Sequence, residues 1–133
     1  MEMFEELVMY RLTKDGDVFV SPQYDLGNGW SCPDFVALNF QERTASVVEV
    51  TAAYRPGNLA KKVAGREKQW FAKLRAQLEQ NSVVDASWTY RVEVFVRREA
   101  ASHFKQEFGT QTDVGIHVLE DIGFPWQWAR SHK

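Results

Sequence analysis

The chain has 133 residues, of which 44% are hydrophobic and 26% are charged, proportions typical of a soluble globular protein. This length predicts a single domain, residues 1–133, with a core large enough to fold alone. No apolar run approaches the roughly 18 residues that cross a bilayer, and the acidic start does not resemble a secretory signal. We therefore expect a cytoplasmic protein without a membrane partner. The single Cys32 excludes an internal disulfide and does not form a zinc site.

The charge is distributed unevenly along the chain. A net charge of −2 argues against a surface that attracts nucleic acid everywhere. Residues 55–75, however, hold seven basic residues against one acidic residue, Glu67, which gives this segment a local charge of +6. This asymmetry predicts a local basic surface. Its basic residues are Arg55, Lys61, Lys62, Arg66, Lys68, Lys73 and Arg75.

The first half of the chain predicts a helix followed by a three-stranded meander. Apolar residues recur at helical spacing over residues 2–12. Apolar segments bounded by turn residues then predict strands at 17–21, about 34–40 and about 45–53. The loop 22–32, between the first two strands, is rich in Gly, Asn, Asp and Pro.

The second half predicts further helices and strands in alternation. One apolar stripe predicts a helix over roughly 59–80, with Asn58 as its N-cap. A strand at about 88–97, a helix at 99–108 and a strand at 115–119 follow. The resulting order αβββαβαβ predicts an α/β or α+β fold, in which helices flank a mixed sheet. The stripe consists of Leu59, Val63, Trp70, Leu74 and Leu78, with Phe71 at its margin.

Two acidic residues interrupt the apolar second and third strands. Asp34 follows Pro33 at the start of one strand, and Glu49 lies in the middle of the next. A carboxylate in an apolar strand costs free energy unless it is compensated, and a divalent cation shared by both side chains is one compensation. If residues 41–44 form the turn, Asp34 falls a little beyond the partner of Thr51, near Glu49. Both carboxylates are therefore expected to face one cleft.

These residues resemble the PD-(D/E)XK nuclease superfamily. The match consists of Pro33-Asp34 and, after fourteen intervening residues, Glu49-Val50-Thr51. The predicted elements over residues 2–97 also match the αβββαβ core of this restriction-endonuclease-like fold. The resemblance implies a Mg²⁺-dependent DNA endonuclease, with Mn²⁺ as a further ion. Because a domain of 133 residues has no added recognition module, we expect it to act as a homodimer or in a larger nucleoprotein complex.

The resemblance also implies the roles of individual residues. Asp34 and Glu49 would bind the metal together with the Val50 carbonyl, and Glu6 or Glu5 of the first helix would complete the site. The family's lysine, whose charge stabilises the developing phosphorane, belongs at the position of Thr51. A neutral hydroxyl cannot supply that charge, so this departure puts catalysis in question.

The helix over 59–80 offers a replacement for the missing lysine. Lys62, Arg66, Gln69 and Lys73 are spaced four, three and four residues apart and so form one stripe beside the apolar face. Either Lys62 or Arg66 would supply the charge, and Gln69 would correspond to a glutamine that some family members carry. The same stripe, with Arg55 and Lys61, would contact phosphates, and Trp30 in the polar loop would stack on an unpaired base.

Other interpretations of the same residues remain open. Asp34 is also typical of a turn or cap, and Glu49 of an edge position paired with Arg43 or Arg55. A basic helix face is often only solvated. The main alternative is a catalytically degenerate nuclease fold that binds nucleic acid or a protein partner. A third hypothesis is a metal-free interaction protein that uses the Trp-rich segment 124–128 as its contact surface.

Overall fold

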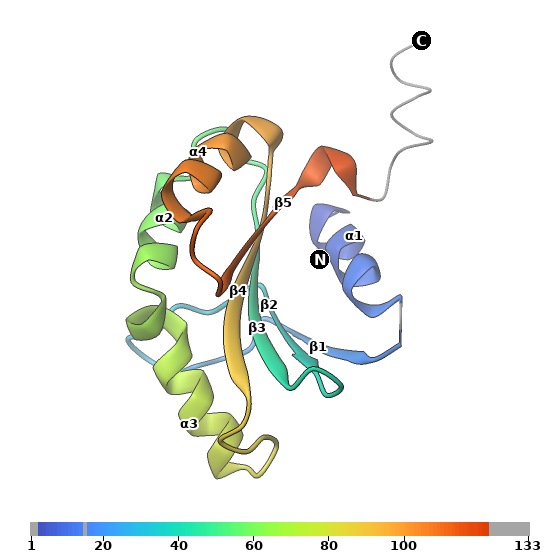
Figure 1. Ribbon diagram of the computed structural model, residues 1–133, viewed down its shortest axis with the longest axis vertical. Helices are drawn as coiled ribbons and strands as arrows, with labels where there is room; N and C mark the ends of the chain where they lie inside the picture. The colour runs from blue at the N-terminus through green and yellow to red at the C-terminus, as the bar shows by residue number, and fades with distance from the viewer. Residues whose placement is uncertain (1–2, 15, 123–133) are drawn as a thin grey trace.

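The computed structural model describes residues 3–14 and 16–122, in which a five-stranded mixed sheet lies between helices (Figure 1). The strands follow one another across the sheet in chain order. The first three pair antiparallel as a meander, and the last three pair parallel, because helices form the crossover connections between them. The predicted α+β fold is thereby confirmed. The strands are β1 (Val18–Pro22), β2 (Phe35–Asn39), β3 (Thr44–Val50), β4 (Thr89–Val96) and β5 (Val114–Val118).

Helices cover the two faces of the sheet unequally (Figure 1). On one face lie α2 (Gly57–Ala64), α3 (Ala72–Gln80) and α4 (Arg98–Phe108), and on the other lies α1 (Met3–Thr13). Because side chains alternate along a strand, Val47 packs into the large core under α2–α4, whereas Val48 packs with Val8 of α1. No helix of the described residues is both long and apolar enough to span a bilayer.

The predicted helix over 59–80 is interrupted in its middle. It begins at Gly57, and no side chain caps it, so the prediction of Asn58 as N-cap is wrong. Gly65 ends α2, and a π-helical turn at Glu67–Phe71 leads into α3. Glycine weakens a helix interior. The π turn is wider than an α-helical turn, so the side of the helix that faces the core rotates and the adjacent Trp70 and Phe71 are both buried. The apolar stripe itself is buried as predicted.

The meander turn is one residue earlier than predicted. The last pair of the hairpin is Asn39 with Thr44, so residues 40–43 form the turn and Arg43 adopts a positive φ of 55°. The third strand ends at Val50, short of the predicted residue 53. The segment 124–128, on which the third hypothesis depends, lies outside the described residues.

Candidate metal site

The two acidic residues lie directly opposite each other on β2 and β3. Phe35 pairs with Val48, and continuing that register by one residue places Asp34 opposite Glu49. The predicted register, with Asp34 beyond Thr51, is therefore wrong by about two residues because of the earlier turn. Alternation places both acidic side chains on the face covered by α2 and α3, since the adjacent Val36 and Val47 belong to that core.

Each carboxylate accepts a hydrogen bond from the backbone of the other strand. The Val50 N–H donates to Asp34 Oδ2 over 2.8 Å, and the Asp34 N–H donates to Glu49 Oε2 over 2.7 Å. These reciprocal bonds extend the β2–β3 ladder past its last regular pair and hold the two side chains together. Glu49 is only 8% exposed, so its environment is largely dry.

Glu49 is difficult to ionise at this place. Burial, followed by the nearby charge of Asp34, raises the pKa of Glu49 to about 8, although the Asp34 N–H and the Lys62 charge act in the opposite direction. Two carboxylates that share a dry site cannot both ionise at neutral pH without a further cation. The pair is therefore poised to take up either a proton or a metal ion.

Lys62 is the cation that α2 brings toward this pair. It directly precedes Val63, which is fully buried in the core against the sheet. Its charge lowers the pKa of both Glu49 and Cys32, although for each group other effects raise the pKa overall. Of the predicted stripe, Lys62 therefore lies near enough to the acidic pair to affect it electrostatically.

Gln69 is joined to the loop before Asp34. The Ser31 hydroxyl donates to Gln69 Oε1 over 2.7 Å, so the π-helical turn and the loop 22–32 are held together beside the acidic pair. The same loop brings Cys32 close, but burial and the charges of Asp25 and Glu49 raise the pKa of its thiol. Cys32 is therefore a poor nucleophile here.

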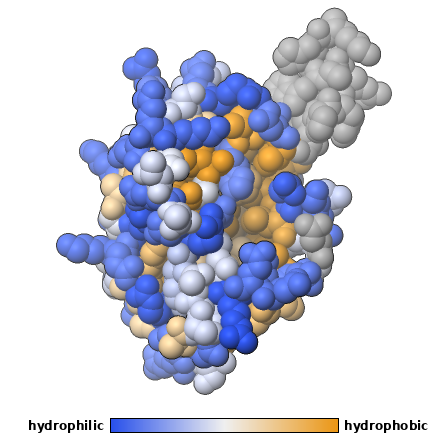
Figure 2. All heavy atoms as spheres, in the orientation of Figure 1, coloured by the Kyte–Doolittle hydropathy of each residue, from blue (hydrophilic) through white to orange (hydrophobic). Residues whose placement is uncertain are grey.

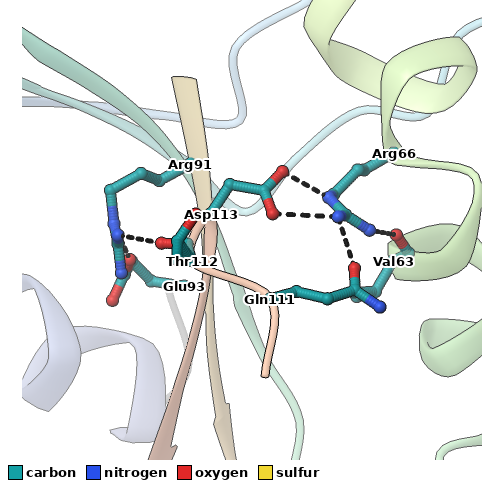
Figure 3. A network of polar contacts seen from close by, with 7 residues as sticks. All are labelled: Val63, Arg66, Arg91, Glu93, Gln111, Thr112 and Asp113. Carbon is teal, nitrogen blue, oxygen red and sulfur yellow. Dashed lines mark hydrogen bonds and ion pairs between the residues drawn. The ribbon is translucent and has the colours of Figure 1, made fainter. Parts of the chain in front are cut away.

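Arg66 is occupied elsewhere. Its guanidinium binds Asp113 through two bonds of 2.6 and 2.9 Å, donates to Gln111 over 2.5 Å, and donates to the Val63 carbonyl over 2.8 Å (Figure 3). Only 17% of its side chain is exposed. Arg66 thus anchors the segment that enters β5, and this geometry does not fit the predicted role as a replacement lysine or a phosphate contact.

Glu6 does not join the acidic pair. It lies on α1, whose buried Val8 packs with Phe35 and Val48 on the opposite face of the sheet. Among the described residues, no group of three His, Cys, Asp or Glu side chains could hold a metal ion. The predicted third acidic ligand, whether Glu6 or Glu5, is therefore not supplied in this structure.

The remaining candidates take several positions. Thr51 directly follows β3; its N–H donates to the Phe95 carbonyl, and its hydroxyl accepts from the Ala53 N–H. Trp30 is half-buried and packs against the core, so only part of its ring is available for stacking. Arg55 and Lys61 are exposed, whereas Lys73 is half-buried.

Sequence reasoning missed two features. One is Ser31, the partner of Gln69, which no spacing rule identifies. The other is a polar cluster on the α1 side of the sheet, where Glu93 binds His117 and Arg91. The alternation of polar Arg91 and Glu93 with buried Val92 and Val94 along β4 is the signal that could have predicted a polar surface there.

No protein-family model matches this chain significantly, and neither does any curated protein or solved structure. The resemblance to the PD-(D/E)XK superfamily therefore depends on the residues from Pro33 to Thr51 and on the order of the elements around them.

Proposed function

We propose that this protein is a Mg²⁺-dependent endonuclease whose metal is bound by Asp34 and Glu49. The observation that carries the proposal is their placement on adjacent strands, with a carboxylate at Glu49 whose pKa is raised to about 8. Perturbed carboxylates that converge at one place are characteristic of functional sites. Mg²⁺ needs only one or two carboxylates, since it retains water and phosphate oxygens as its other ligands.

The donor set fits this ion. Each carboxylate uses one oxygen for the reciprocal backbone bonds, Oδ2 of Asp34 and Oε2 of Glu49. Carboxylate oxygens have capacity for further contacts, and oxygen is the ligand that Mg²⁺ prefers. When bound, the ion would polarise the phosphodiester and lower the pKa of a coordinated water.

Lys62 would supply the charge that Thr51 cannot. It is close enough to Glu49 to lower the carboxyl pKa, and Arg66 is bound to Asp113. Its ammonium group would stabilise negative charge that develops on the phosphate. Gln69, held by Ser31, would orient the loop 22–32 along the path of the nucleic acid. The exposed Arg55 and Lys61 would contact the phosphate backbone without reading sequence.

A catalytically degenerate, nucleic-acid-binding domain is the second candidate. Two observations favour it: the acidic pair has no third acidic ligand among residues 3–14 and 16–122, and both carboxylates already accept backbone hydrogen bonds that stabilise the hairpin. This candidate predicts salt-sensitive binding of DNA without cleavage.

Calorimetry with Mg²⁺ and Mn²⁺ tests the proposal directly. We expect divalent binding to the wild-type protein, alone or with a DNA duplex, and its loss in Asp34→Asn and Glu49→Gln. Glu42→Gln is the matched control, because Glu42 is an exposed acid in the turn of the same hairpin.

Cleavage assays on linear, nicked and branched DNA complete the test. We expect each of the two site variants to reduce cleavage at least a thousandfold, whereas Glu42→Gln retains it. Lys62→Gln is expected to lose cleavage while it retains metal binding. Metal-dependent cutting by folded Glu49→Gln protein would refute the proposed site, and DNA binding without any cutting would favour the degenerate domain.

A further inference from the structure

The face of the sheet opposite the acidic pair is only partly covered. On this face α1 packs over the apolar residues Phe35 and Val48, and a cavity of about 530 Å³ opens beyond it. In Figure 2 the hydrophobic residues gather beside α1, and hydrophilic or intermediate residues occupy the lower part of the view. This volume is typical of small-molecule sites. The lining includes Arg11, Leu12, Ser46, Arg91, Phe95 and His117.

Glu93 is a largely buried acid in the lining of this cavity. Its Oε2 accepts from Arg91 Nε over 2.8 Å, and its Oε1 lies 2.7 Å from His117 Nε2. Burial alone would raise the pKa of Glu93, but the hydrogen bonds with His117 and Arg91 outweigh it and lower the pKa. A Cβ at Gly115 would lie 2.1 Å from Glu93 Oε1, so this glycine leaves the space that the carboxylate occupies.

The His117 ring is held in place by its contacts with Glu93 and Phe95. Its ring stacks on Phe95 with centroids 4.4 Å apart and an interplanar angle of 14°, and Phe95 is only 2% exposed. One face of the imidazole and its Nε2 edge are therefore covered, whereas 40% of the side chain remains accessible. An accessible imidazole face is a surface on which a flat aromatic ring can stack.

Two guanidinium groups of the cavity lining keep hydrogen-bond donors that no described residue accepts. Both oxygens of Glu93 have partners, and Arg91 also donates through Nη1 to the Thr112 carbonyl over 2.6 Å (Figure 3). Arg91 Nη2 and the exposed Arg11 have no hydrogen-bond partner among the described residues, and the acids of the lining are Glu42 and Glu93, of which Glu93 is paired with Arg91. Guanidinium groups bind phosphate through paired hydrogen bonds.

We propose that this cavity binds a nucleoside monophosphate, with its base stacked on His117 and its phosphate bound by Arg11 and Arg91. The apolar side chain of Leu12 would cover the ligand from α1. This site is independent of the proposed nuclease function, because it lies on the opposite face of the sheet and uses none of the same residues.

Calorimetry with adenosine 5′-monophosphate tests the proposal in a buffer that contains EDTA, so that no divalent metal occupies the acidic pair. We expect saturable one-to-one binding. Adenosine and inorganic phosphate should each bind at least tenfold more weakly, because each lacks one half of the recognition. The His117 ring signals should shift in NMR spectra upon titration. Absence of binding, or equal binding of adenosine and the monophosphate, would overturn the proposal.

Matched variants locate the bound ligand. Arg11→Gln removes an exposed charge that has no structural partner among the described residues, so we expect a folded protein with at least tenfold weaker binding. Lys14→Gln removes an equal charge near the same end of α1, outside the cavity lining, and should bind as the wild type does. Glu49→Gln should also bind normally. Loss of binding in Glu49→Gln, or unchanged binding in Arg11→Gln, would place the ligand elsewhere and contradict the proposal.

Discussion

Glu49 and Glu93 lie on adjacent strands, in adjacent registers and on opposite faces of one sheet, but their pKa values are shifted in opposite directions. Both are largely buried, and burial is the largest factor that raises the pKa of each. Glu49 has another acid, Asp34, as its nearest charged neighbour, and its pKa rises to about 8. Glu93 has Arg91 and His117, and its pKa falls below the ordinary value.

The difference shows that partners, rather than burial, decide the charge of a buried carboxylate in this protein. The protein satisfies the charge of Glu93 with its own side chains, Arg91 and His117. It leaves Glu49 undercompensated, and the compensation must come from a proton or from a metal ion.

The largest expected effect is on the pH dependence of stability, through Glu49→Gln. The folded pKa of Glu49, about 8, exceeds its unfolded value of 4.5, so its stabilising contribution is full below pH 4.5 and is lost as the pH rises through 8. In EDTA, the variant should therefore be more stable than the wild type by roughly 4 kcal/mol at pH 8, and about equal to it near pH 4.

Urea denaturation at several pH values measures this difference. If the acidic pair binds Mg²⁺, the ion should restore the stability of the wild type at pH 8 and leave the variant unchanged. Glu93 should behave oppositely, because its lowered pKa stabilises the fold above pH 4.5 and that contribution is lost on acidification. The same trend with pH for both glutamates would contradict the comparison.

A smaller effect is expected from Gly115→Ala, which probes the Glu93 side. The new Cβ would lie 2.1 Å from Glu93 Oε1 and must displace the carboxylate from its partners. We expect a loss of roughly 2 kcal/mol in the free energy of unfolding. Gly57→Ala is the control, because nothing lies within 4 Å of a Cβ at Gly57, and this change should be nearly neutral. Equal stability of the two variants would mean that Glu93 is not tightly held.

The smallest effect is expected from Thr51→Lys, which gives Glu49 a cation of the kind that Glu93 already has. Thr51 is half-buried and directly follows β3, so the longer side chain should be accommodated with a change in stability below about 0.5 kcal/mol near pH 5. The new charge should lower the pKa of Glu49 and reduce the loss of stability toward pH 8. Ala86→Lys, in the exposed turn before β4, adds the same charge far from Glu49 and should leave the pH profile unchanged. Loss of the circular-dichroism signal in Thr51→Lys alone would show that position 51 faces the core.

Local patterns in the sequence were sufficient for the elements and for the convergence of the two acids. Alternating and helical periodicities identified the five strands and the buried stripe of the second helical region, because the spacing of apolar residues indicates which face of an element is buried. The separation of Asp34 and Glu49 across one short turn limited them to neighbouring positions on adjacent strands. The register was wrong by about two residues, since the choice of turn residues shifts every pair that follows.

The sequence by itself therefore determined the α+β class, the order of its elements and the proximity of Asp34 to Glu49, all of which follow from interactions between residues close in the chain. Only the tertiary structure decided which residues outside the hairpin reach them. Arg66 binds Asp113, 47 residues away in the chain, and Glu6 lies on α1, which packs on the other face of the sheet. Glu93 met His117 across two parallel strands. Contacts between distant segments depend on how whole elements pack, and the pattern within a single element does not record that packing.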